Sequence, residues 1–128
     1  MAARTTEDIR LGRLELQIMN AVWEHGEASV HDVKDALGSG RKPAYSTVLT
    51  MMRKLEAKGY LAHETRDRAF VYRPVLEKGE ARRNLLGALV DRLFGGSPAQ
   101  LVNSLVEDGR VSAAELAEIR RILGKRRG

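Results

Sequence analysis

The apolar residues of this chain change their spacing at Gly59, and this change limits the possible folds more than any other feature of the sequence. Before Gly59 they recur every three or four residues, which is typical of amphipathic helices. Between residues 60 and 73 the period becomes two, which is typical of strands with one buried face. The sequence therefore predicts a group of helices followed by a small antiparallel hairpin.

Three helices are predicted before the hairpin, and each ends at a glycine. The first begins near Leu11, and the second has Ser29 as its N-cap. Residues 38–43 combine glycines, bases and a proline, which indicates a turn. The third helix is expected from about Ser46 to Lys58.

The third helix has two contrasting faces. Its buried stripe is expected to consist of Val48, Met51, Met52 and Leu55. Its opposite face consists of Ser46, Thr50, Arg53, Lys54 and Ala57. A solvated helix face usually pairs Glu with Lys, whereas this face combines hydroxyl groups with bases and has no acid. The combination favours contact with nucleic acid.

Residues 60–66 and 69–73 are predicted to form the two arms of the hairpin, with Asp67 and Arg68 at the turn. Asp-Arg is a weaker turn signal than Asp-Gly, so a longer turn stays open. His63 on the first arm is interpreted as a strand residue rather than a metal ligand.

Basic residues are concentrated in one block of the sequence. Eight bases and three acids give residues 41–76 a net charge of +5, while four bases and seven acids give residues 1–40 a net charge of −3. A concentrated basic block suits contact with a polyanion such as DNA, and a solvated basic face is the alternative.

Three further helical segments are predicted after Glu77. Ser97 begins one of them as an N-cap, and Ser112 with Glu115 forms a capping box for the last. These segments total about fifty residues, too few to bury their own branched apolar side chains. We expect them to pack against a second copy of the chain, the alternative being packing onto the first seventy residues.

The order of these elements is that of a winged helix-turn-helix, in which the third helix enters the major groove and the hairpin forms the wing. The predicted fold is mainly α with a small β-hairpin wing, followed by a C-terminal helical dimerisation region. We expect a winged-helix DNA-binding domain over residues 1–76 and a helical dimerisation domain over residues 77–128.

Several segments, spread over nearly the whole chain, together resemble the sequences of a known family. These segments are Leu14 to Trp23, Tyr45 to Val48, Thr50, residues 53–59, residues 68–74 and the Leu-Val-Xaa-Xaa-Leu-Val-Glu run at residues 101–107. In this order they resemble the penicillinase repressor family, which includes the β-lactamase and methicillin-resistance repressors. The resemblance implies a homodimeric, cytoplasmic repressor of the antibiotic response that binds an inverted-repeat operator.

Candidate contacts follow from position in the sequence and from this resemblance. Arg41 and Lys42, just before the third helix, are expected to hold phosphates. The recognition-helix contacts that the resemblance implies are Ser46, Thr47, Thr50, Arg53 and Lys54, and the wing contacts are Arg66 and Arg68. Thr50 and Arg53 are placed to touch base edges. The implied dimer surface consists of Leu86, Leu89, Val90, Leu93, Leu101, Val102, Leu105 and Leu116.

Two departures from the family limit what the resemblance implies. Copper-responsive members end in paired Cys-Xaa-Cys motifs, and this chain has no cysteine, so neither copper sensing nor any other metal or cofactor is expected. Antibiotic-responsive members are cleaved at an Asn-Phe bond, where this chain has Ser104 and Leu105. That bond is the candidate cleavage site, and a membrane sensor protease is a candidate partner.

Protein binding and enzymatic activity are the alternatives to DNA binding. A winged helix that binds protein instead of DNA would have an exposed apolar recognition face, and Leu49 at the edge of the face leaves room for this alternative. An enzyme is not expected, because the three histidines lie on different predicted elements without ligand spacing and no nucleophile accompanies a base. No apolar stretch is long enough to predict membrane insertion.

Overall fold

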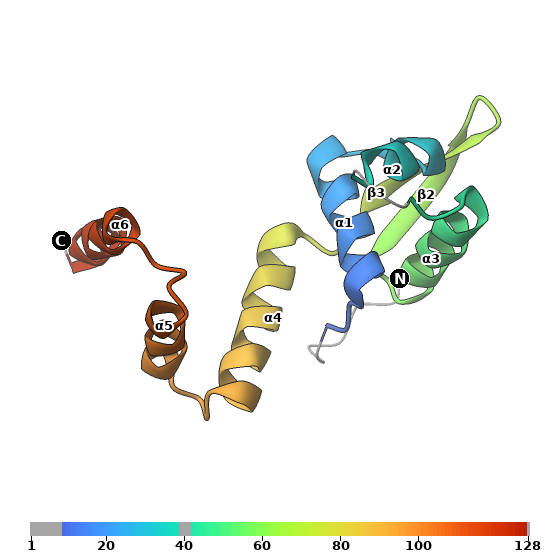
Figure 1. Ribbon diagram of the computed structural model, residues 1–128. Helices are drawn as coiled ribbons and strands as arrows, with labels where there is room; N and C mark the ends of the chain where they lie inside the picture. Colours follow the sequence, from blue (N-terminus) through green and yellow to red (C-terminus); the bar gives the residue numbers. More distant parts are fainter. Residues whose placement is uncertain (1–8, 39–41, 128) are drawn as a thin grey trace. The chain divides into compact units, whose positions relative to one another are not determined.

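The computed structural model describes residues 9–38 and 42–127. Its elements follow in the order α1 (Arg13–His25), β1 (Ala28–Ser29), α2 (Val30–Ala36), α3 (Tyr45–Ala57), β2 (Leu61–Arg66), β3 (Ala69–Pro74), α4 (Lys78–Leu93), α5 (Pro98–Glu107) and α6 (Ala113–Arg127) (Figure 1). The mainly α fold with a hairpin wing and C-terminal helices is thus confirmed.

The predicted helix caps are formed by short-range hydrogen bonds. The Ser29 hydroxyl oxygen accepts from the Asp32 amide at 3.1 Å, and the Asp32 carboxylate accepts from the Ser29 amide at 3.0 Å. Ser97 caps α5, and Ser112 forms the same reciprocal pair with Glu115 before α6. These caps satisfy amide groups that have no partner within the first turn of a helix.

The three strands form one antiparallel sheet in the order β1, β3, β2. Arg66 pairs directly with Ala69, so the hairpin turn consists of Asp67 and Arg68 alone. Both residues have positive φ, 49° and 67°, as the tightest hairpin turns require. The longer turn that the sequence left open does not form. The third strand, β1, is an addition to the predicted hairpin.

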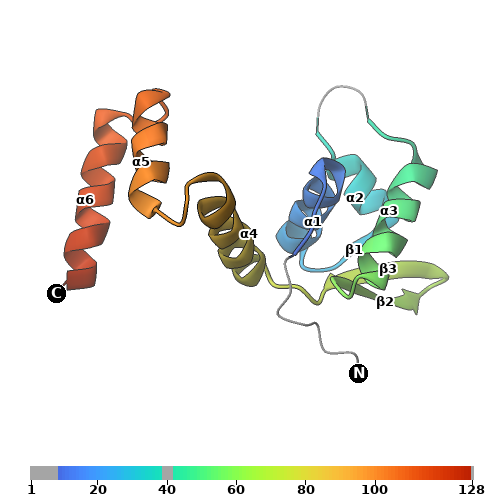
Figure 2. The same ribbon diagram turned by 90° about the horizontal axis from the view of Figure 1, so that it is seen from below.

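The core of the winged helix lies where α1 and α3 meet the sheet. Its largest fully buried side chains are Ile18, Met19, Val22, Val33, Val48, Met52, Leu55, Leu61, Tyr72 and Leu76. Of the predicted stripe on α3, only Met51 is half-buried rather than fully buried. In Figure 2, α2 and α3 lie side by side, and α3 also contacts β2.

An ion pair between the buried Glu15 and the half-buried Lys58 joins α1 to the end of α3. Lys58 donates to the Glu15 carboxylate at 2.8 Å and to the Arg10 carbonyl oxygen at 3.0 Å. Burial raises the pKa of the Glu15 carboxyl, but the hydrogen bonds from Lys58 and from the Gly12 amide outweigh burial and lower that pKa below its ordinary value. The pair therefore holds α1 against α3 most firmly while Glu15 is ionised.

The chain divides into two compact units, residues 1–85 and residues 86–128. The first turns of α4 belong to the first unit, because Ala81 is buried in its core and Leu85 packs against that core. The domain boundary expected after Leu76 stays a prediction. Among residues 86–126, whose exposure is described, none is buried.

Candidate nucleic-acid interface

One side of α3 is exposed and polar while the other side is buried. Val48, Met52 and Leu55 are fully buried against the sheet and α1. The exposed residues include all five expected recognition-helix contacts, Ser46, Thr47, Thr50, Arg53 and Lys54. The sequence therefore separated the two faces of this helix correctly.

α3 places no carboxylate on its exposed polar face. Glu56 is the single acid of the helix, and its carboxylate oxygen lies 2.7 Å from the His63 ring nitrogen on β2. The acid is thus turned toward the sheet, and the hydroxyl groups and bases on the other side of α3 have no anion beside them on their own helix. Such a surface offers hydrogen-bond donors to phosphates and to base edges.

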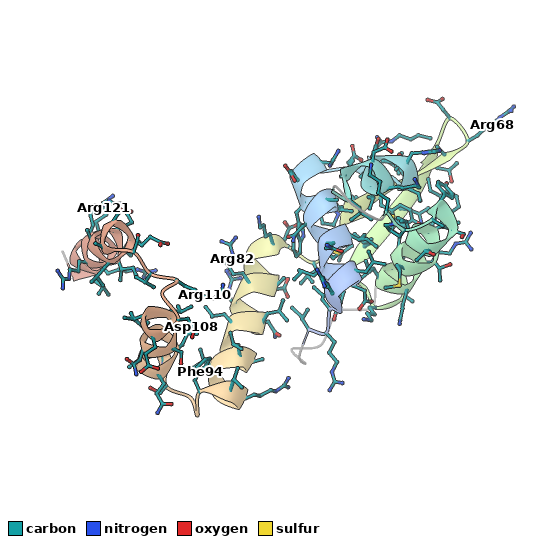
Figure 3. All side chains as sticks on the ribbon, in the orientation of Figure 1. Arg68, Arg82, Phe94, Asp108, Arg110 and Arg121 are labelled. Atoms are coloured by element: carbon teal, nitrogen blue, oxygen red, sulfur yellow. The ribbon has the colours of Figure 1, made fainter. Side chains whose placement is uncertain are left out.

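The wing carries one arginine at its tip. Figure 1 shows the β2–β3 hairpin extending beyond the helices, and Figure 3 shows Arg68 at its end with the side chain directed away from the body. Asp67 is the neighbouring turn residue, and Arg68 forms no ion pair among the described residues. A cation in this position can reach a phosphate without giving up a partner.

Arg66, the other predicted wing contact, is already engaged by two carboxylates. Its guanidinium donates to Glu27 at 2.7 Å and also to Glu64. The hydrogen bond with Glu27, followed by that with Glu64, raises the pKa of Arg66 above its ordinary value. Glu27 precedes β1, so Arg66 ties the wing to the segment between α1 and the sheet.

A hollow of about 350 Å³ lies between α2, α3 and the wing. Its lining residues are Ser29, Val30, His31, Tyr45, Leu49, Arg53, Arg68, Ala69 and Phe70. The floor is mainly apolar, and Arg53 and Arg68 contribute from separate elements. Neither Tyr45 nor Phe70 is among the contacts predicted from the sequence, although both are exposed aromatic residues next to predicted element boundaries.

Ring contacts link the two strands of the wing. His63 stacks on Phe70 with ring centroids 4.2 Å apart and lies 5.3 Å from the Tyr72 ring. The Tyr72 hydroxyl is buried and has no hydrogen-bond partner in the described part of the chain, and burial raises its pKa. His63 is a strand residue, as predicted. No cluster of potential metal ligands occurs among residues 9–38 and 42–127.

Lys42 is exposed and lies just before α3, whereas Arg41 lies outside the described residues. Ser104 and Leu105 lie within α5 and are half-buried.

Eight residues were expected to form the dimer surface. In this chain Val90, Leu101 and Leu105 are half-buried, and Leu86, Leu89, Leu93, Val102 and Leu116 are exposed. Within a single chain, the helices of residues 86–126 therefore expose apolar side chains to water.

In the described part of the chain, no helix is long and apolar enough to cross a membrane.

Comparison with known proteins gives one consistent result. The family model described as penicillinase repressor matches residues 11–125. The chain is 27% identical to the penicillinase repressor of Bacillus licheniformis over 109 residues, which cover 85% of each chain. It is 36% identical to the transcriptional regulator BlaI of Mycobacterium tuberculosis over 122 residues, covering 91% of this chain and 84% of that protein. It is 23% identical to the methicillin resistance regulatory protein MecI of Staphylococcus aureus over 112 residues, covering 88% of this chain and 91% of that protein.

Proposed function

Because the chain belongs to the penicillinase repressor family, a family of transcriptional repressors without enzymatic activity, we propose that it is a homodimer that represses transcription from an inverted-repeat operator. Each protomer reads one half-site with α3 and touches the DNA backbone with the β2–β3 wing. It acts in the cytoplasm on genes of the antibiotic response, the role indicated by the names of its relatives.

One observation carries this proposal above the others: the acid-free polar face of α3 lies beside Arg68, which forms no ion pair among the described residues. In the proposed complex, Thr50 and Arg53 contact base edges in the major groove. Ser46, Thr47 and Lys54 contact the edges of the same groove. The phosphates are held by Arg41, Lys42 and Arg68. To reach a phosphate, Arg66 must exchange one of its carboxylate partners, so its contribution is the smaller of the two wing arginines.

The hollow between α3 and the wing supports the same mode of binding. A winged helix places α3 in the major groove and the wing against the backbone or the minor groove, so a DNA strand passes between them. The apolar floor suits the face of a deoxyribose, and Arg68 adds positive charge beside it. The lining residues therefore have the chemistry that a sugar-phosphate backbone requires.

The helical region after Leu85 supports the proposed dimer. Leu93 and Leu123 are 68% and 58% exposed, and none of residues 86–126 is buried in its own chain. Burying such side chains contributes about 25 cal/mol per Å² of apolar surface. A second copy offers the same surface, and a closed two-fold pair buries both.

Repression is proposed to end when this dimer is disrupted. Joining two DNA-reading modules raises their combined affinity by roughly 10² to 10⁴ relative to one module. Cleavage at Ser104–Leu105 by a membrane sensor protease, or local unfolding of α5, would therefore release the operator without altering any DNA contact.

Selection of operator sequences from random DNA, followed by footprinting, tests the proposal. We expect an inverted repeat whose half-site centres are separated by a whole number of helical turns, because a two-fold dimer presents both copies of α3 to one face of the duplex. Protection of a single unrepeated site would contradict the dimer. Absence of any sequence preference would contradict DNA reading altogether and favour a protein-binding winged helix.

A further inference from the structure

A groove unrelated to the DNA-binding surface lies within the first unit, between α1 and the first turns of α4. Its volume is about 270 Å³. Leu16 and Trp23 line it from α1, and Leu85 lines it from α4. The Trp23 indole N–H donates at 2.8 Å to the carbonyl oxygen of Leu76, so its polar group is satisfied and the orientation of the ring is fixed. The groove therefore presents preformed aromatic and aliphatic surface.

The rim of this groove is positively charged. Lys78 and Arg82 line it from α4, and Asn20 lines it from α1. Arg82 lies on the first turns of α4 in Figure 3. No acid is among the lining residues, and neither cation forms an ion pair within the part of the chain that the structure describes. Two cations beside an apolar surface complement a ligand with one anionic end.

We propose that the groove binds a small amphipathic carboxylate, with a hydrocarbon or aromatic body and a single carboxylate group. The body lies against Trp23 and Leu85, and the carboxylate lies at the rim beside Lys78 and Arg82. The volume lies just below the usual range for small-molecule sites, about 300 to 1,000 Å³, so the body is no larger than that of a medium-chain fatty acid. This site shares no residue with the face of α3 or the wing, so it stands whether or not the chain reads an operator.

The position of Trp23 makes the proposal easy to test, because it is the only tryptophan of the chain. Its fluorescence in the full-length protein reports on the groove without a label. We would titrate the protein with sodium octanoate and, as a neutral compound of equal chain length, with octan-1-ol. We expect a saturable change in emission with octanoate. Octan-1-ol should bind roughly tenfold to twentyfold more weakly, because each of the two exposed ion pairs usually contributes about threefold to fivefold.

Variants of two neighbouring arginines distinguish binding in the groove from a general effect of positive charge on affinity. Arg82→Gln should weaken octanoate binding about threefold to fivefold and leave octan-1-ol binding unchanged. Arg83→Gln removes the same charge from the next position of α4, which is exposed and outside the groove, and should leave both affinities unchanged. Lys78→Gln repeats the test independently if Arg82→Gln does not fold.

Three results would overturn the proposal. They are the lack of a saturable change with octanoate, equal affinity for octanoate and octan-1-ol, and equal losses in Arg82→Gln and Arg83→Gln. A Trp23 emission that depends on protein concentration and never responds to octanoate would show that a second copy of the chain covers the groove instead.

Discussion

Replacing Arg53 with alanine should weaken binding to the operator far more than binding to unrelated DNA. Arg53 is exposed on α3 and forms no ion pair among the described residues, so the substitution leaves no partner unsatisfied. Alanine is a strong helix former, and the free energy of unfolding should change by no more than about 0.5 kcal/mol. Any large loss of affinity can then be assigned to the DNA contact.

The size of the effect follows from the geometry of the contact. An arginine that donates two hydrogen bonds to a guanine edge contributes about 1 to 3 kcal/mol of discrimination. A dimer uses Arg53 twice, so the operator complex should lose about 2 to 6 kcal/mol. Arg68→Ala, which removes a proposed phosphate contact, should weaken both DNAs alike and reduce the slope of log affinity against log salt by about 2 per dimer.

Fluorescence anisotropy with labelled operator and with a scrambled duplex, at several salt concentrations, measures both quantities. Arg83→Ala, outside the interface, serves as the control for loss of one positive charge. Equal losses on the two duplexes for Arg53→Ala would refute the reasoning. They would show that Arg53 contacts the backbone in the hollow together with Arg68.

The remaining predictions concern the dimer, the ion pair between α1 and α3, and the wing. A fragment ending at Leu85 should sediment as a monomer and bind the operator roughly 10² to 10⁴ times more weakly in gel shifts, and a dimeric or equally tight fragment would contradict this. Lys58→Ala should lower the free energy of unfolding by about 1 to 3 kcal/mol in urea melts at pH 7, because Glu15 is left buried without its partner. Since the pKa of Glu15 is lower in the folded protein than its ordinary value of 4.5, its contribution to stability is complete above that pH and is lost as the pH falls through the folded pKa. Glu15→Gln should therefore show a shallower fall in Tm below pH 4.5 than the unmodified protein, and parallel curves would argue against the shift. Arg66→Ala should reduce affinity for any DNA less than Arg68→Ala does, and an equal reduction would place Arg66 on a phosphate.

The sequence predicted features that depend on residues close together in the chain. The cap at Ser29 and the two faces of α3 follow from spacings of three or four residues, and both are confirmed. The strand β1 has only two residues and exists because it pairs with Tyr72 and Val71, more than forty residues later in the sequence. No periodicity can indicate so short a strand.

The features that the sequence did not indicate depend on distant residues. Arg66 looks like a free wing base until the fold brings Glu27 beside it from 39 positions earlier. The unit boundary depends on Ala81, which is buried, and on Asn84, whose side-chain oxygen accepts from the Ile9 amide at 2.9 Å. The groove beside Trp23 likewise needs α4 to return to α1.

The two-residue turn of the wing restricts how such a hairpin can change in length. In an antiparallel pair, hydrogen-bonded and non-hydrogen-bonded positions alternate, and a two-residue turn closes only one of the two kinds. In this chain the pair that closes the turn is Arg66 and Ala69. If each arm gained one residue, the closing pair would fall at the other kind of position, which this turn cannot close. The tip would also turn to the opposite side of the sheet. A longer wing that keeps this turn must therefore gain two residues on each arm. Its reach then increases in steps of about 7 Å. Related chains, natural or designed, should consequently differ in wing length by four residues at a time while the direction of the tip residue stays the same.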